Sequence, residues 1–314
     1  MSLDCEAPVV KLEQEIEELK KKAAGSGADL GKEIASLEKK LLSLKQEVYS
    51  KLTPWEQVQL ARHPQRPLMS DYIRLAFSEF IELHGDRLFG DDPSLIGGFA
   101  MIDKHRVMLL GFNKGGSVEE KVKANFGMAH PEGYRKALRL VKLAEKYGIP
   151  VVSLIDTPAA YPGAAAEARG QAEAIGHCIM EMTSVEVPLI AIITGEGGSG
   201  GALGIAVADT VMMLSNAIYS VIPPEGCAAI LWKDSNKAPV AAEALKITAK
   251  SLLELRVIDQ IIPEPLGGAH RDHAATAAAL KAALVTSLAS LKRISRGKLA
   301  GRRLDKLAAM GRFK

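Results

Sequence analysis

The 314-residue sequence is poor in several features that define whole classes of protein. Its three cysteines, Cys5, Cys178 and Cys227, stand far apart, so neither a disulfide framework nor a zinc site is expected. No uncharged apolar run reaches about 18 residues, and residues 1–6 lack the basic start and apolar core of a signal peptide. We therefore expect no metal in this chain, no membrane span and a cytoplasmic location.

Charge is distributed unevenly along the chain. The net formal charge is +3, yet residues 291–314 carry nine Lys or Arg against one Asp. We interpret this basic C-terminal tail as a solvated, partly ordered end on a mildly acidic body. No motif that reads nucleic acid occurs, so we do not expect nucleic acid as a partner.

The first fifty residues predict two amphipathic helices. Apolar residues recur at intervals of three and four from Val9 to Leu19 and from Ile34 to Val48, and Gly25-Ser26-Gly27 predicts a turn between them. Helices this narrow cannot bury their apolar stripes alone. We expect a helical hairpin over residues 1–52 that either lies on its own domain or serves as an assembly arm for a partner.

The remainder of the chain predicts one domain over residues 53–290, in which helices and strands alternate. We expect helices at 54–63, 71–84, 131–147, 165–183, 224–232, 238–248 and 273–290, and strands at 95–102, 107–112, 150–155, 188–193, 211–214, 217–221 and 257–262.

One pattern occurs twice in this domain. Strand 150–155 runs into a loop rich in Pro and Gly and then a helix, and strand 188–193 runs into a glycine-rich segment and another helix. Such units form parallel strands with crossover helices, and ligands gather at the strands' C-terminal ends. We therefore expect an α/β fold in which both loops meet at one end of the sheet.

The glycine-rich segment, residues 194–201, is the strongest candidate for a functional site. Five of the seven positions 195–201 are glycine, and a helix start follows, so backbone N–H groups are left uncovered. Such a segment holds an anion, either a phosphate or an oxyanion that develops during a reaction.

Three chemistries stay open for this segment. The spacing of Gly195, Gly197 and Gly200 suits a dinucleotide, but no acidic residue follows the next strand. No Gly-Lys-Ser/Thr follows either, which excludes a P-loop. A second open chemistry uses the consecutive backbone N–H groups of Gly200 and Gly201 as an oxyanion hole.

A serine hydrolase is the remaining alternative. Ser199 lies in a Gly-x-Ser-x-Gly pattern that suits a nucleophile elbow. Such an enzyme needs a positioned histidine and a carboxylate, and nothing in the sequence joins His270 or His273 to Ser199. We therefore interpret Ser199 first as a small polar loop residue.

We do not expect the charged residues near the two loops to take part in the chemistry. We expect Glu196 to be solvated and Asp156 to cap a turn. Lys114, Lys121 and Lys123 suit a phosphate, but lysines on a helix face are usually solvated.

Several longer blocks of sequence resemble a known family, the α subunits of the bacterial-type acetyl-coenzyme A carboxylase carboxyltransferase. The blocks are LTPW at 52–55, ELHGDR at 82–87, NFGMAHPEGYRKA at 125–137, GEGGSGGAL at 195–203, PEG at 224–226 and EPLGGAH at 264–270. This resemblance implies a crotonase-like fold, a superhelix of ββα units, here with an N-terminal helical hairpin. It also implies transfer of a carboxyl group from carboxybiotin to acetyl-CoA, which yields malonyl-CoA in the first committed step of fatty acid synthesis.

The resemblance also assigns residues. It implies that Gly200 and Gly201 donate backbone N–H groups to the ureido oxygen of biotin. The lining of the biotin pocket would comprise Thr157, Ala159, Tyr161, Gly163, Gly198 and Ser199.

The resemblance implies partners as well. Biotin would be carried on a separate biotin carboxyl carrier protein and charged by a biotin carboxylase. A homologous β subunit would supply the hole for the acetyl-CoA enolate and a zinc-binding element, giving an α2β2 assembly. A non-catalytic binding subunit of such a carboxylase complex is a further alternative.

The sequence departs from the family pattern at two places. Ala159 stands where the family usually has glycine, so a left-handed backbone there would cost about 1 kcal/mol. Residues 114–118 read KGGSV, without the charged pair that is usual in the family, and we assign no role to this loop.

Overall fold

The computed structural model describes residues 3–26 and 30–311. Its α-helices are α1 (Ala7–Ser26), α2 (Gly31–Ser50), α3 (Pro54–Ala61), α4 (Met69–Ala76), α5 (Val118–Lys123), α6 (Pro131–Tyr147), α7 (Ala164–Ala168), α8 (Gln171–Ser184), α9 (Ser199–Ala206), α10 (Pro224–Trp232), α11 (Ala238–Leu245), α12 (Ala249–Glu254), α13 (His273–Leu291) and α14 (Arg296–Ala308). Its strands are β1 (Ser78–Glu82), β2 (Leu95–Ile102), β3 (His105–Phe112), β4 (Val151–Thr157), β5 (Leu189–Gly198), β6 (Thr210–Leu214), β7 (Ile218–Ser220) and β8 (Gln260–Ile262).

One mixed sheet organises the body of the molecule. Its strands follow the order β1-β2-β3-β4-β5-β6-β8, and β7 pairs with the end of β5. Strands β1 to β3 are antiparallel, whereas β3, β4, β5, β6 and β8 are parallel. From β1 to β6 each strand pairs with the next one along the chain, whereas β7 returns to pair with the end of β5 and β8 pairs with β6.

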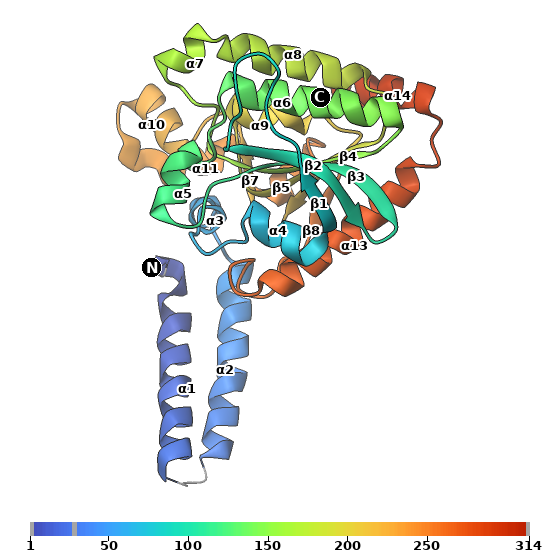
Figure 1. The fold of residues 1–314 in the computed structure, drawn as a ribbon. Helices are drawn as coiled ribbons and strands as arrows, with labels where there is room; N and C mark the ends of the chain where they lie inside the picture. Colours follow the sequence, from blue (N-terminus) through green and yellow to red (C-terminus); the bar gives the residue numbers. More distant parts are fainter. Residues whose placement is uncertain (1–2, 27–29, 312–314) are drawn as a thin grey trace.

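Helices cover the sheet on both sides. Helices α6, α8 and α9 pack on one another and α14 packs on α8, while α13 and α4 lie together on the other side (Figure 1). The central strand β5 is buried along its whole length, and its apolar half, Leu189–Ile193, forms the middle of the core. The glycine-rich half of β5 therefore leaves the core at a fixed position.

The segment expected as one helix over 71–84 is instead a helix followed by a strand. Helix α4 ends at Ala76, Phe77 is extended, and β1 pairs with β2. Glu79 has a φ of +51°, at the irregularity in that pairing, and Ile81 is exposed, although the helical spacing of apolar residues would place it inward. Strand pairing with β2 thus overrides the helical spacing of apolar residues.

Three further elements differ from their expected bounds. The helix expected over 165–183 is split into α7 and α8, because Gly170 takes a left-handed backbone with φ +82°. The helix expected to reach Thr248 ends at Leu245, where Lys246 has a φ of +54°, and α12 follows. The glycine segment expected as a turn is strand as far as Gly198, and α9 begins at the next residue.

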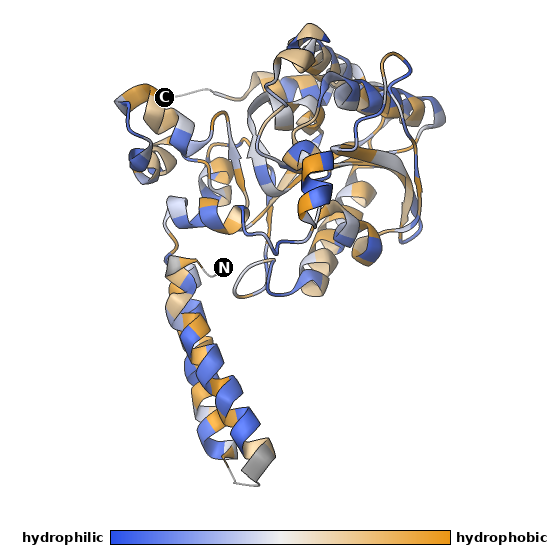
Figure 2. Cartoon of the chain, turned by 60° about the vertical axis from the view of Figure 1, so that its left-hand side comes forward, coloured by the Kyte–Doolittle hydropathy of each residue, from blue (hydrophilic) through white to orange (hydrophobic). Residues whose placement is uncertain are grey.

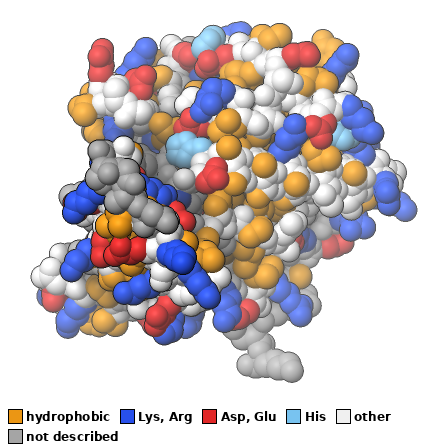
Figure 3. Space-filling model, turned by 90° about the horizontal axis from the view of Figure 1, so that it is seen from below, with side chains coloured by type: hydrophobic (Ala, Val, Ile, Leu, Met, Phe, Trp, Pro, Cys, Tyr) orange, Lys and Arg blue, Asp and Glu red, His pale blue; other side chains and the backbone are white. Residues whose placement is uncertain are grey.

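The hairpin of α1 and α2 projects away from the body (Figure 1). Hydrophilic and hydrophobic residues alternate along the hairpin (Figure 2), and Val9, Leu12 and Ile16 of α1 are buried while α2 has no buried residue. Helix α1 continues through Ser26, and the expected turn residue Gly27 lies outside the described residues. Seen from below, the face that carries the hairpin mixes acidic and basic side chains (Figure 3).

The basic C-terminal stretch is more ordered than its composition suggested. Residues 296–308 form α14, and Arg303 is only 1% exposed. Its guanidinium donates to the carbonyl oxygens of Met182, Val185 and Val187 and pairs with Asp209 at 2.9 Å. One arginine therefore ties the C-terminal helix to the body.

Helix α13 is long and apolar enough, by length and composition alone, to cross a membrane. Within the described chain it behaves as a packing helix, because Leu280, Leu284 and Leu288 on one face join the main core.

Candidate functional site

The two expected loops meet at the ends of β4 and β5. These strands are parallel, and Thr157 pairs with Gly197. A Cβ added to Gly198 would lie 1.8 Å from the carbonyl oxygen of Pro158, and one added to Gly201 would lie 2.4 Å from the backbone of Ala159 and Ala160. Any side chain at either glycine would push the loops apart, so these glycines are required for the contact itself.

Helix α9 begins within this contact. Gly198 is its N-cap, and Ser199, Gly200 and Gly201 form its first turn, whose N–H groups have no partner within a helix. Ser199 has a φ of +51°, an unusual backbone for a residue with a side chain. A Cβ on Gly200 would meet only Ile175, at 3.8 Å, so this position is open on its outer side.

An apolar pocket of about 330 Å³ opens beside this turn, and we call it the glycine-turn pocket. It is lined by Ser199, Gly200 and Leu203 from α9, and by Lys306, Leu307 and Met310 from the C-terminal stretch, among others. A partly enclosed, mainly apolar pocket with the start of a helix at one end is typical of a small-molecule site.

The loop that leaves β4 is fixed by its own hydrogen bonds. The Thr157 hydroxyl donates to Ala159 O at 2.8 Å and accepts from Ala159 N at 3.3 Å. Ala159 is not among the described residues with a positive φ. The strain considered for an alanine at this position therefore does not arise.

Tyr161 and Gly163 shape the far end of the same loop. The Tyr161 ring stacks on His130 with centroids 4.3 Å apart, and its backbone N–H donates to Ala129 O at 3.0 Å. A Cβ on Gly163 would lie 2.4 Å from the Tyr161 ring. The Gln171 side chain donates to both Ala129 O and Tyr161 O, which fastens the loop to the start of α6.

Tyr134 on α6 packs against the glycine turn and α9. The sequence around Tyr134 did not indicate this role. Its hydroxyl donates to Gly201 O at 3.2 Å, and a Cβ on Gly204 would lie 2.6 Å from its ring. Burial raises the pKa of this tyrosine well above its usual range, so it stays a neutral donor. Gly201 is thus held between Tyr134 on one side and the loop from β4 on the other.

The nearby charges form ion pairs rather than solvated groups. Glu196, expected to be solvated, is 5% exposed and pairs with Arg62 at 2.7 Å. Asp156 accepts from Glu196 N at 2.8 Å and pairs with Lys114. The ion pair that accompanies the burial of Glu196 is formed with Arg62, which lies 134 positions earlier in the chain. The local sequence around Glu196 gives no indication of this partner.

No base lies beside Ser199 in the described chain. His270 contacts Glu6 at 3.2 Å and its ring centroid lies 4.0 Å from that of His63, with the two planes tilted by 34°, and His273 contacts Gln65 O at 2.7 Å. The two histidines that a hydrolase could have used are therefore engaged elsewhere, and the structure gives the serine hydrolase hypothesis no support.

Glu6, His63 and His270 also form a buried group of residue types that bind metals, with ligand atoms within 4.8 Å of one another. Glu6 already accepts from Tyr49 and Arg271 as well as His270. Burial would raise the pKa of Glu6, but the hydrogen bonds from His270 and Tyr49 outweigh it and lower the pKa to about 2. The guanidinium beside the carboxylate repels a cation, so we interpret the group as an anchor for the hairpin.

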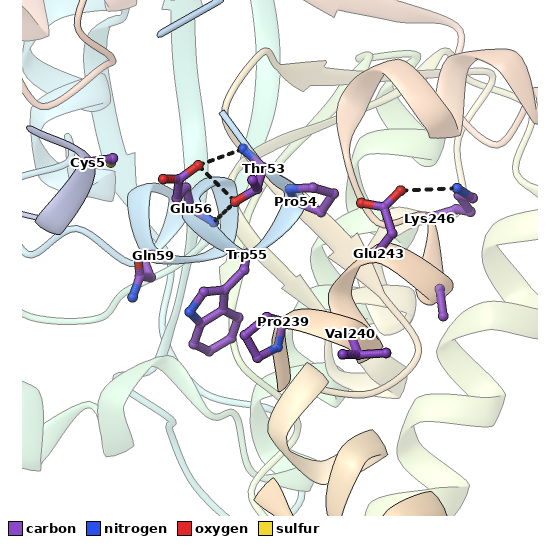
Figure 4. Close-up of a pocket in the computed structure, with 11 residues that line it drawn as sticks. Cys5, Thr53, Pro54, Trp55, Glu56, Gln59, Pro239, Val240, Glu243 and Lys246 are labelled. Atoms are coloured by element: carbon purple, nitrogen blue, oxygen red, sulfur yellow. Dashed lines mark hydrogen bonds and ion pairs between the residues drawn. The ribbon is translucent and has the colours of Figure 1, made fainter. Parts of the chain in front are cut away.

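A larger pocket, about 750 Å³, lies between α3 and α11 and does not include the glycine segment. Figure 4 shows the Trp55 ring beside Pro239, with the Thr53–Glu56 capping box above it and the Glu243–Lys246 ion pair at the other edge. Its size alone does not make it the functional site, because none of the convergent backbone donors described above reaches it.

Comparison with known proteins identifies the family of the chain. The family described as acetyl co-enzyme A carboxylase carboxyltransferase-like matches residues 2–311. The chain is 54% identical over 314 residues to the acetyl-coenzyme A carboxylase carboxyl transferase subunit alpha of Gemmatimonas aurantiaca, covering 99% of this chain and 98% of that protein. It is 51% identical over 312 residues to the protein of the same name from Azoarcus sp., covering 99% and 97%.

Solved structures share the fold at low identity. The transcarboxylase 12S core superimposes with a TM-score of 0.59 at 17% identity, over 73% of this chain and 42% of that chain. The Pseudomonas malonate decarboxylase hetero-tetramer in complex with coenzyme A gives 0.57 at 18% identity, over 70% and 89%. The fold is therefore that of the crotonase-type carboxyltransferases, as expected. Within that class, the chain belongs to the acetyl-CoA carboxylase carboxyltransferase α-subunit family.

Proposed function

We propose that this chain is the α half of a biotin-dependent acetyl-CoA carboxyltransferase, an enzyme active only with a β subunit. The reaction would move a carboxyl group from carboxybiotin to acetyl-CoA and yield malonyl-CoA for fatty acid synthesis. The observation that carries the proposal is the clamped glycine turn, in which Gly201 sits against Ala159 and Ala160 while Gly200 faces the glycine-turn pocket. Identity of more than half over nearly the whole chain to a named α subunit supports it.

The proposed catalytic groups are the backbone N–H groups of Gly200 and Gly201. Carboxybiotin supplies the carboxyl group, and negative charge develops on its ureido oxygen as that group leaves. N–H donors bind a developing anion more tightly than the neutral oxygen, and this difference accelerates the reaction. A fixed donor of this kind is worth about 3 kcal/mol of barrier.

The other proposed pocket residues act mainly by shaping the site. Thr157, Ala159, Tyr161 and Gly163 hold the loop from β4 in place through the contacts described above. Gly198 permits that loop to approach, and Ser199 lines the pocket beside the donors.

The assembly remains part of the proposal. We expect a zinc-bearing β subunit in an α2β2 complex, a biotin carboxyl carrier protein and a biotin carboxylase, all in the cytoplasm. We assign residues 1–52 to an assembly arm, 53–290 to the carboxyltransferase domain and 291–314 to the basic tail.

The test is malonyl-CoA-dependent carboxylation of free biotin by this chain mixed with a β subunit. The wild-type complex should be active. Gly200→Ala adds a methyl group that meets only Ile175 at 3.8 Å, so it should fold and assemble normally. That methyl group crowds the oxygen site, and we expect kcat to fall about tenfold or more.

Gly176→Ala is the matched control, because this exposed helix glycine has no atom within 4 Å of an added Cβ. It should leave the rate unchanged. An inactive wild-type complex with a competent β subunit, or full activity in Gly200→Ala, would overturn the proposal.

A further inference from the structure

A pocket with several charged lining residues lies on the other side of the loop from β4. We call it the Phe126 pocket; its volume is about 330 Å³, and Arg62, Arg66, Lys114, Lys121, Phe126 and Pro158 are among its lining residues. Pro158 separates it from the glycine turn, since its carbonyl oxygen rests against Gly198. The pocket therefore opens where β4 and β5 end, the place at which α/β sheets bind ligands.

The backbone around Phe126 is unusual. Asn125, Phe126 and Gly127 are three consecutive residues with left-handed φ values of +46°, +56° and +82°. The glycine is needed, because a Cβ at Gly127 would lie 2.8 Å from Lys114 Cγ, and Asn125 is held by a 3.1 Å contact with His130. Left-handed backbone at residues other than glycine is strained, and such strain gathers at functional sites.

The strained segment leaves Phe126 exposed at the pocket. Its exposed fraction is 52%, although the ring would be better buried if only stability mattered. An aromatic face held over a concave surface is a platform on which a planar ring can stack.

Cationic groups outnumber acidic ones around the Phe126 pocket. Arg62 and Lys114 are neutralised by Glu196 and Asp156, which line the same pocket. Lys121 has no ion-pair partner among the described residues, and it rises from α5 at the rim. Arg66 is 4% exposed, and its Nε has no hydrogen-bond partner, although its other nitrogens bind Glu264 and Thr194 O. Arg66 is thus paired with Glu264 inside the fold, and among the described residues the pocket keeps the ammonium group of Lys121 for an anion.

We propose that the Phe126 pocket binds a phosphorylated nucleotide, with the base stacked on Phe126 and a phosphate paired with Lys121. A planar ring and an anion are the two groups that this lining can hold, and a nucleotide carries both. Two sources share this chemistry, a free nucleotide and the nucleotide end of coenzyme A. The second source rests on the proposed function, and it would place the nucleotide end on this chain while the acyl end reaches the β subunit.

Calorimetric titration of the full chain tests this proposal at low and at physiological salt. The probes are coenzyme A, 3′-phosphoadenosine 5′-diphosphate, ADP, pantetheine and inorganic phosphate. We expect the nucleotides to bind and pantetheine not to bind. Phe126→Ala should weaken binding about 5- to 100-fold, the range for loss of one stacked base. Lys121→Ala should weaken it several-fold and reduce its salt dependence.

Matched controls exist for both variants. Lys123→Ala removes an exposed lysine of the same helix that does not line the pocket, and Phe89→Ala removes an exposed aromatic ring elsewhere. Both should bind nucleotides as the wild type does. Circular dichroism should show the same fold for all four variants.

The outcomes separate the possibilities. Equal binding of coenzyme A and ADP indicates a free-nucleotide site, and binding that needs the 3′-phosphate indicates coenzyme A; either result supports the pocket. Absence of nucleotide binding, wild-type affinity in Phe126→Ala, or binding of inorganic phosphate as tightly as nucleotide overturns it. Transferase activity without nucleotide binding would sink only this proposal, and nucleotide binding without transferase activity would sink only the proposed function.

Discussion

Gly201 has the tightest surroundings of the residues to which we assign catalysis. The backbone of Ala159 and Ala160 lies against one side, and the Tyr134 hydroxyl binds its carbonyl oxygen. Gly200, one residue earlier, has open space outside it. Gly201 therefore fixes the turn, whereas Gly200 leaves room for a ligand.

Replacement of Tyr134 by Phe tests whether the turn must be held at its carbonyl. The variant loses one hydrogen bond to a buried peptide, which is worth about 1 kcal/mol of stability. If the bond also positions the donors, kcat of the complex should fall about tenfold while KM for biotin stays unchanged. Steady-state kinetics with a β subunit and a melting curve measure the two effects separately.

Tyr72→Phe is the control for that substitution. Tyr72 is equally buried, at 1% exposure, but its hydroxyl has no hydrogen-bond partner among the described residues. Its loss should therefore leave both stability and kcat near the wild-type values. A Tyr134→Phe variant with unchanged kcat would show that Tyr134 serves packing alone.

The sequence indicated the glycine site more clearly than the distant residues that pack around it. The donors Gly200 and Gly201 could be picked out because glycines and a helix start are local features of the chain. The buried pair of Arg62 and Glu196 could not, because residues 134 positions apart meet only after the sheet has formed. A solvated glutamate is the sound expectation for a loop until such a partner is known.

At the scale of elements, the hairpin depends on a small polar anchor where it joins the body. Glu6, directly before α1, receives hydrogen bonds from Tyr49 in the last turn of α2 and from His270 and Arg271 of the body. These contacts fasten both hairpin helices to one loop, although α2 itself buries nothing.

The anchor should make hairpin docking sensitive to acid. The pKa of Glu6 is lowered from 4.5 to about 2 because its hydrogen bonds outweigh the effect of burial. A carboxylate whose pKa is lower in the folded than in the unfolded chain stabilises the fold at pH values above the unfolded-state pKa. This stabilisation is lost as the pH falls through the folded-state pKa, toward 2. Glu6→Gln should thus lower the free energy of unfolding by about 1.5–3 kcal/mol at pH 7 and by little near pH 2.

Denaturant unfolding at several pH values measures this difference. Glu17→Gln is the control on the same helix, because its ion pair with Lys21 is exposed. A constant difference between wild type and Glu6→Gln from pH 7 to pH 2 would contradict the account.

Elements with a clear period were predicted closely, and those set by tertiary pairing were not. Helix α6 runs over the expected 131–147 with Gly148 in its left-handed cap. The prediction of one helix over 71–84 was wrong, because apolar residues of a strand can have helical spacing by chance. Pairing with β2 makes residues 78–82 a strand.

At the scale of the whole molecule, the C-terminal helix closes the structure. Helix α14 packs on α8, and the residues at its end line the glycine-turn pocket. Composition suggested a solvated tail because nine basic residues stand against one acidic residue there, but one buried arginine is enough to dock a helix. Arg303 thus fixes the position of the helix whose end lines the proposed site, so its loss should affect both the stability of the fold and that site.

Arg303→Met should release this helix. The substitution leaves Asp209, 6% exposed on its side chain, without its cation, and leaves the carbonyl oxygens of Met182, Val185 and Val187 without a donor. Loss of one partner from a buried ion pair costs about 3–5 kcal/mol. We expect a drop in melting temperature of about 10 °C, because each kcal/mol shifts a chain of this size by about 2–4 °C.

Arg302→Met separates the buried contact from the loss of charge, since Arg302 is exposed on the same turn and forms no ion pair among the described residues. It should melt within about 1 °C of the wild type, as surface substitutions usually do. Because Leu307 and Met310 line the glycine-turn pocket, Arg303→Met should also raise KM for biotin below its melting transition, whereas Arg302→Met should not. Equal melting temperatures for the two variants would mean that α14 docks without Arg303. An unchanged KM in a destabilised Arg303→Met would mean that its end is not part of the proposed site.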